Sequence, residues 1–174
     1  MKKINKILSA LVALLAIGFV ATSLIACSDD DDDDDDTVST VAVYKDSEAT
    51  ADSYETITFF SDNTVKGHSY DKYTEEGFSV ITDFDTFVGT YTGNPNADGT
   101  VKITVTKMAD EDAVSEEEMV KKCEAAVAAG KTSLTFTNSD FPLEAVSDVS
   151  IEAVVSGKTA TIDFDGDSDT YTRQ

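Results

Sequence analysis

The sequence predicts a mainly β protein in which an antiparallel meander closes into a barrel, with one inserted α-helix at about residues 115–130. From Thr37 onward, short segments rich in Thr, Val, Ile, Phe and Tyr are separated by Gly, Asn and Asp, as strands are separated by turns. Several segments alternate apolar and polar residues, which is typical of half-buried antiparallel strands. The connections at 61–63, 96–99 and 156–158 are short, which favours hairpins between neighbouring strands and hence a meander.

Ten segments are predicted to be strands. The clearest alternation places Val101, Ile103 and Val105 on one face, with Lys102 and Thr104 on the other. The predicted strands are residues 38–44, 54–60, 64–73, 78–84, 86–92, 100–108, 133–137, 149–155, 159–164 and 170–173. With 174 residues, the chain has room for about one domain, which we place at 38–174.

The helix prediction depends on its two ends and on one apolar stripe. Ser115 is suited to cap the first turn while Glu118 reaches back to the cap, and Gly130 ends the helix. We expect the stripe to pack against one end or flank of the β structure. Its members, spaced three and four apart, are Met119, Val120, Cys123, Ala126 and Val127.

The N-terminus has the layout of a secretory signal peptide. A basic stretch with Lys2, Lys3 and Lys6 precedes an uncharged apolar run at 7–21. As an α-helix, a run of this length would rise about 22 Å, which is short of a hydrocarbon core of about 30 Å. We therefore expect residues 1–26 to be a signal peptide rather than a permanent transmembrane helix.

The signal ends in Leu24-Ile25-Ala26-Cys27, which resembles the lipobox of bacterial lipoproteins. The resemblance implies that the signal is cut before Cys27 and that the Cys27 thiol carries a diacylglyceryl thioether. Two or more acyl chains anchor a protein stably, since each buried methylene contributes about 0.8 kcal/mol. The alternative is a general secretory signal in which Cys27 happens to fall in the cleavage region.

Eight consecutive aspartates, residues 29–36, follow Ser28. Like charges repel and stay solvated, so we expect residues 27–37 to form an extended, disordered tether. The start of this run resembles the acidic export signal that places lipoproteins of Bacteroidetes-type bacteria on the outer face of the outer membrane. The resemblance implies a lipid-anchored, surface-exposed protein of the cell envelope. The alternative is that the run serves only as a spacer.

The charge of the chain excludes one class of partner. The formal net charge is −21, from 13 basic and 34 acidic residues. Three of the basic residues precede the first acidic residue, Asp29, so the rest of the chain is more acidic still. Such a surface repels phosphate, and we expect no binding to nucleic acid.

Two single residues were candidates for chemistry. Cys123 lies on the apolar stripe of the helix, where a cysteine acts as a small hydrophobic residue. His68 alternates with Lys66 and Tyr70 on a strand face that the sequence predicts to be exposed and without a partner for the imidazole. Nucleophilic catalysis needs a nucleophile, a base and an orienting group, so we predict no catalytic residue and no enzyme activity.

An acidic segment near the C-terminus invites comparison with a calcium loop. Its glycine, Gly166, falls at the fourth position and strands flank it, whereas an EF-hand loop has glycine at the sixth position and helices on both sides. An acidic β-turn is therefore favoured over a calcium site, and we predict no metal ligands and no cofactor. The aspartates concerned are Asp163, Asp165, Asp167 and Asp169.

The strand region resembles the bacterial lipocalin-like lipoproteins. The similar segments are residues 57–64, 88–92 and 99–104, and the chain closes on a short Gly-Asp-x-Tyr-Thr-type strand at 166–173. The chain has no Trp and so lacks the Gly-x-Trp of the true lipocalins. The resemblance implies a lipocalin-like, calycin-type β-barrel.

Two functions follow as expectations. In the first, the protein is a surface lipoprotein, attached to the membrane through Cys27, whose barrel binds a small apolar ligand or an extracellular partner. In the second, it is a structural or interaction module whose barrel is filled by its own side chains. An interior cavity of a few hundred Å³ would favour the first.

Overall fold

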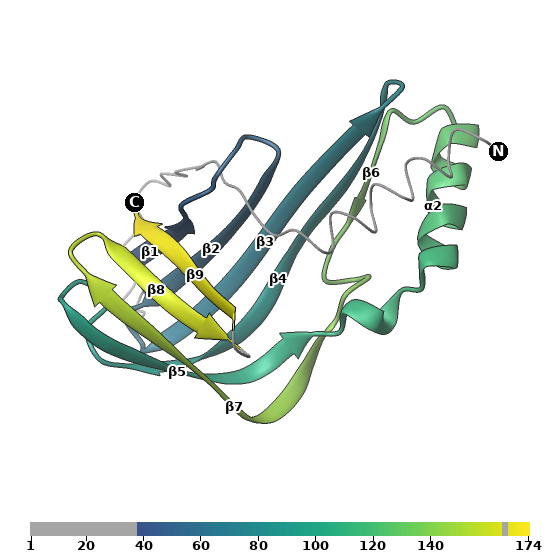
Figure 1. The fold of residues 1–174 in the computed structure, drawn as a ribbon. Helices are drawn as coiled ribbons and strands as arrows, with labels where there is room; N and C mark the ends of the chain where they lie inside the picture. Colours follow the sequence, from purple (N-terminus) through teal and green to yellow (C-terminus); the bar gives the residue numbers. More distant parts are fainter. Residues whose placement is uncertain (1–37, 165–166) are drawn as a thin grey trace, which may run out of the picture.

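The computed structural model describes residues 38–164 and 167–174, which form nine strands, one α-helix and one short 3-10 helix (Figure 1). The inserted elements between β5 and β7 are η1 (Glu111–Ala113), α2 (Glu116–Ala128) and β6 (Ser133–Phe136). The remaining strands are β1 (Thr40–Asp46), β2 (Ser53–Phe60), β3 (Thr64–Glu75), β4 (Phe78–Thr92), β5 (Gly99–Ala109), β7 (Leu143–Ser156), β8 (Thr159–Phe164) and β9 (Asp167–Arg173).

These eight remaining strands form a closed antiparallel barrel. Each pairs with the next along the chain, with β5 pairing β7 across the insertion, and β9 returns to pair with β1. The last pairing sets Tyr44 opposite Arg173 and Asp46 opposite Tyr171. Closure leaves no barrel strand with an unpaired edge, and an eight-stranded up-and-down barrel is the lipocalin-like architecture. The predicted fold, a meander closing into a barrel with one inserted α-helix, is confirmed.

The largest differences from the prediction lie in β4 and β7. The segments predicted at 78–84 and 86–92 are one continuous strand, β4, because Asp85 stays within it and its N–H donates to Asn138 Oδ1 at 2.8 Å. Strand β7 begins at Leu143 rather than at residue 149 because its first residues pair with the end of β5. The pairing of β5 with β7 is irregular between Val105 and Lys107. Because of this irregularity, the first part of β7 does not continue the apolar–polar alternation by which strands are predicted from a sequence.

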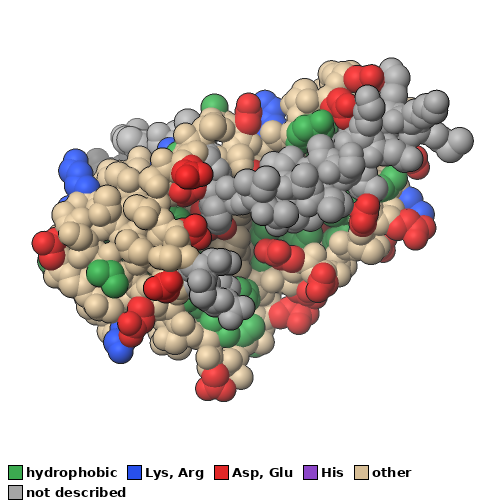
Figure 2. Space-filling model, in the orientation of Figure 1, with side chains coloured by type: hydrophobic (Ala, Val, Ile, Leu, Met, Phe, Trp, Pro, Cys, Tyr) green, Lys and Arg blue, Asp and Glu red, His purple; other side chains and the backbone are tan. Residues whose placement is uncertain are grey.

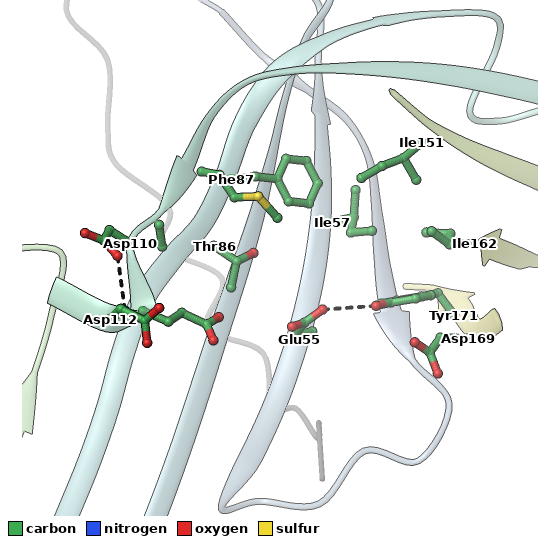
Figure 3. A pocket seen from close by; sticks show the side chains of 13 residues that line it. Glu55, Ile57, Thr86, Phe87, Asp110, Asp112, Ile151, Ile162, Asp169 and Tyr171 are labelled. Carbon is green, nitrogen blue, oxygen red and sulfur yellow. Dashed lines mark hydrogen bonds between the residues drawn. The ribbon is translucent and has the colours of Figure 1, made fainter. Parts of the chain in front are cut away.

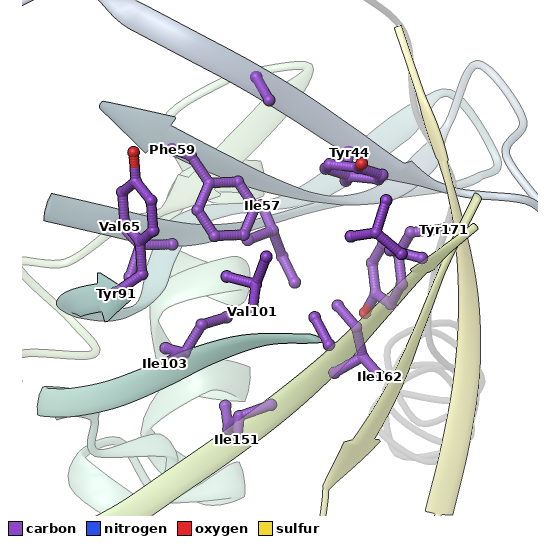
Figure 4. Close-up of a cluster of buried hydrophobic side chains, with 14 of the residues drawn as sticks. Tyr44, Ile57, Phe59, Val65, Tyr91, Val101, Ile103, Ile151, Ile162 and Tyr171 are labelled. Carbon is purple, nitrogen blue, oxygen red and sulfur yellow. The ribbon is translucent and has the colours of Figure 1, made fainter. Parts of the chain in front are cut away.

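One end of the barrel is filled by aromatic and branched side chains (Figure 4). The ring of Phe59 stands edge-on to Tyr44 at 6.0 Å and to Tyr91 at 4.9 Å between centroids. The loop at 93–98 closes this end, because Tyr44 Oη donates to the Pro95 carbonyl oxygen at 2.6 Å. Below the rings, Val101 and Ile103 are fully buried, so this part of the barrel is a packed core.

A second apolar cluster lies outside the barrel. The hairpin of β3 and β4 extends beyond the barrel, and β6 adds to β4 in parallel, with Val80 opposite Leu134 (Figure 1). Helix α2 packs against this extension. The buried members of the cluster are Phe78, Val80, Phe84, Met119, Cys123, Ala126, Phe136 and Phe141.

The predicted capping of helix α2 is confirmed, but part of its predicted apolar stripe is not buried. Ser115 and Glu118 form the capping box. Met119, Cys123 and Ala126 are buried, but Val127 is 45% exposed and Val120 is only half-buried. The helix contacts a narrow, three-stranded extension rather than a broad sheet, so the buried stripe is narrower than the sequence pattern suggests.

Replacing Ser115 with Ala is expected to lower the free energy of unfolding by about 1 kcal/mol, the usual effect of losing an N-cap side chain. The change removes the acceptor for the Glu118 N–H and one of the two donors to the Glu118 carboxylate, while the Ser115 N–H is kept. Chemical denaturation of the parent chain and the variant measures the effect. Glu124→Ala on the exposed side of α2 is the control and should change stability by less than about 0.5 kcal/mol. Equal losses in both variants would contradict the capping role.

Candidate functional site

The other end of the barrel contains a cavity of about 530 Å³ (Figure 3). Its walls come from β2, β4, β5, β7, β8 and β9, and η1 lies at its rim. The cavity therefore belongs to the barrel interior, opposite the end that the 93–98 loop closes. Small-molecule sites in proteins commonly have volumes of about 300–1,000 Å³, so this cavity is of the size that encloses a small ligand.

The deeper wall of the cavity is apolar. Ile57, Phe87, Ile151 and Ile162 are buried and come from four different strands, where strand alternation turns them inward. Phe87 lies over Gly67 of the paired strand, where a Cβ atom would come within 2.3 Å of the ring. Glycine at this position is what allows the Phe87 ring to form part of the wall. An apolar molecule would bury surface against this wall without leaving a polar group unsatisfied.

Glu55 is an acidic group on the inner face of the barrel wall. It precedes Ile57 and Phe59 in the same inward register of β2. Tyr171 Oη donates to Glu55 Oε2 at 3.0 Å, the contact drawn in Figure 3. The pKa of Glu55 is raised to about 8, mainly by burial and also by the nearby charges of Asp169, Asp46 and Glu111, against the lowering effect of the Tyr171 hydrogen bond. Burial and the Glu55 carboxylate in turn raise the pKa of Tyr171.

The rim of the cavity is acidic. Asp110 caps η1 by accepting from the Asp112 N–H at 3.1 Å, and its own N–H donates to the Pro142 carbonyl oxygen at 3.0 Å. With Glu111 and Asp112, this turn places three carboxylates beside the opening, and Asp169 adds a fourth from β9. The described residues that line the cavity include no Lys, Arg or His. Figure 2 shows acidic side chains spread around the apolar patches of the visible face.

The arrangement combines an apolar interior with one hydrogen-bonded carboxyl group and an acidic opening. Small-molecule binding sites commonly combine such features, with apolar contacts supplying most of the affinity and a few polar groups orienting the ligand.

His68 lies outside this site, and the prediction that it has no partner is wrong. Its Nδ1 lies 3.1 Å from Asp85 Oδ1, and its Nε2 lies 3.4 Å from Asp83 Oδ1. Lys66 Nζ also pairs with Asp85 at 3.0 Å, and the ring of Tyr54 lies 5.8 Å from the imidazole. Both carboxylates come from β4, which pairs with β3. They could not be predicted as partners of His68 without knowledge of that strand pairing.

The other predicted site residues have different outcomes. Cys123 is buried in the second cluster, as predicted, and burial raises the pKa of its thiol. The strands that flank the acidic turn are confirmed, since Phe164 pairs with Asp167. Residues 165 and 166 lie outside the described residues, as do the predicted signal peptide, Cys27 and the aspartate run. Across 38–164 and 167–174, no group of His, Cys, Asp or Glu is arranged to hold a metal ion.

The sequence reasoning missed Glu55 and Tyr171. A signal for Glu55 was present in the segment SYETITFF, where period-two alternation places Glu55 on the same face as Ile57 and Phe59. That face turns inward, whereas Tyr54 lies on the outer face and stacks on Tyr70 at 4.7 Å. The stacking pair accounts for the partial burial of Tyr54.

Comparisons with known proteins found no match to a family model, to a curated protein or to a solved structure. Among the described residues, no helix is both long enough and apolar enough to cross a membrane.

Proposed function

We propose that this protein is a lipid-anchored bacterial surface lipoprotein whose lipocalin-like barrel binds a small apolar ligand. The observation that supports ligand binding most strongly is the cavity of about 530 Å³ inside the barrel, with its apolar wall. In a structural module with a filled barrel, side chains would occupy that volume. The opposite end of this barrel is filled in that way, since aromatic rings pack there at centroid distances of 4.9 and 6.0 Å.

A single tryptophan tests ligand uptake, because the chain has none of its own. Met108→Trp places an indole at the half-buried edge of the cavity. Decanol brominated at its chain end is expected to quench this indole in a saturable way when the full chain, held in lipid nanodiscs, is titrated. Val154→Trp, on the outer side of the barrel, is the matched control because Val154 is 53% exposed. Equal quenching of both variants, or none of the Met108→Trp variant, would contradict binding inside the barrel.

The anchor is tested separately. Cys27→Ala removes the one thiol beside the signal, which would accept the lipid, and is expected to abolish partition of the protein into the detergent phase. Cys123→Ala is the control, since it removes a thiol buried in the second cluster. Partition of the Cys27→Ala variant like that of the parent would place the anchor elsewhere.

A further inference from the structure

The charges around the cavity constrain the head group of its ligand. Glu55 lies inside, and Asp110, Glu111, Asp112 and Asp169 line the opening. The described lining residues provide no positive charge to balance these five acidic side chains. An anionic amphiphile such as a fatty acid would bring a further negative group into this region, where low dielectric strengthens repulsion.

We propose, building on the proposed function, that the cavity selects cationic amphiphiles, with an apolar tail against Ile57, Phe87 and Ile151 and an ammonium head beside the Glu55 carboxylate. A head at this position would compensate a carboxylate that the fold otherwise holds among apolar and like-charged groups. The acidic rim would attract the same cation during entry. The selected chemical class is therefore alkylammonium rather than fatty acid or neutral alcohol.

The geometry at Glu55 leaves room for this contact. Tyr171 Oη donates to Oε2, so this hydrogen bond engages one of the two carboxylate oxygens of Glu55. Glu55 is half-buried because part of its surface faces the cavity. In Figure 3 the carboxyl group lies below Ile57 and Phe87, with Asp112 on one side and Asp169 on the other. A ligand whose tail fills the deeper part would thus place its head near Glu55.

Selection of a cation would also depend on pH. The groups that face Glu55 are Asp46 from β1, Glu111 from η1, and Asp169 and Tyr171 from β9, and none of them supplies a positive charge. Because burial and these neighbours raise the pKa of Glu55 to about 8, the free cavity holds a protonated Glu55 at pH 6. Binding a permanent cation beside an ionised Glu55 then requires release of a proton. The affinity for a quaternary ammonium should therefore rise between pH 6 and pH 8.5.

Three probes of equal tail length test the proposal on the full-length Met108→Trp chain in nanodiscs. They are decyltrimethylammonium, decanol and decanoate, each brominated at the chain end, titrated in about 0.15 M salt to screen the general negative charge of the protein. At pH 8.5 the ammonium probe is expected to bind about tenfold more tightly than decanol, with decanoate weakest. At pH 6 the preference for the ammonium over decanol should shrink.

Variants locate the source of the preference. Glu55→Gln keeps an acceptor for Tyr171 Oη and is expected to remove most of the tenfold preference. Glu124→Gln makes the same charge change on the exposed face of α2 and should leave the preference intact. If Glu55→Gln fails to fold, as judged by circular dichroism, Asp169→Asn at the rim is expected to reduce the preference by about threefold.

The outcomes separate the two proposals. Equal binding of the three probes, or a preference that survives Glu55→Gln, would overturn the cation selectivity while leaving ligand uptake by the barrel intact. Tightest binding of decanoate would overturn it as well. Absence of quenching by all three probes at both pH values would overturn the proposed function together with this inference.

Discussion

Replacing Phe59 with Ala is expected to lower the free energy of unfolding by about 3–5 kcal/mol, the usual range for truncating a buried aromatic ring. Phe59 is 2% exposed and makes edge-to-face contacts with both Tyr44 and Tyr91. The closed end of the barrel is fastened around it, since Tyr91 Oη donates to the Phe60 carbonyl oxygen at 2.9 Å. Little in this end is free to collapse into the space left by the ring.

Chemical denaturation of parent and variant measures this loss. Val154→Ala on the outer face is the control, because its side chain is 53% exposed and should contribute within about 0.5 kcal/mol. A loss of under about 1 kcal/mol in Phe59→Ala would mean that the closed end is loosely packed. The division of the barrel into a filled end and an open end would then be wrong.

Replacing Glu55 with Gln is expected to stabilise the ligand-free protein at alkaline pH and to have little effect near pH 4.5. In the folded chain the pKa of Glu55 is about 8, against an ordinary value of 4.5. Below pH 4.5 the Glu55 side chain is neutral in both the folded and the unfolded chain, so its ionisation does not affect the free energy of unfolding there. As the pH rises through 4.5 to about 8, the unfolded chain loses this proton before the folded chain does, and stability falls.

The expected gain for Glu55→Gln at pH 9 is on the order of a few kcal/mol relative to the parent. Thermal melts of both chains from pH 4.5 to 9 measure it, with Glu124→Gln as the variant in which no pH-dependent difference is expected. Parallel pH profiles for parent and Glu55→Gln would show that the carboxyl group is solvated like an ordinary surface glutamate. Glu55 would then lie outside the dry interior.

The fold was predictable where local patterns and pairing partners agree. Val101, Ile103 and Val105 alternate with polar residues, and the short turns indicate their neighbours, so the meander follows from local rules. The early start of β7 was not predictable, because pairing with β5 rather than its own alternation makes it a strand. Strand β6 was predicted at 133–137, but its parallel pairing with β4 was not, because that pairing depends on the path of the chain after α2.

The site was less predictable than the fold. A sequence contains the alternation that points Glu55 inward, but it does not show that Tyr171, 116 residues away in the chain, lies 3.0 Å from it. The pairing of β9 with β1, beside β2, creates that contact. Likewise, whether a barrel is filled or hollow depends on how side chains from six strands share the interior volume, which no single segment reveals.

The most direct test of the barrel as a ligand-binding cavity is a crystal structure of the protein grown with decanol that carries bromine at its chain end. The anomalous signal of bromine locates the tail without relying on the shape of the density. We expect a bromine peak inside the barrel, close to Phe87, Ile151 and Ile162, with the closed end unchanged. A barrel whose side chains fill this volume, with no bromine peak in it, would contradict the proposal.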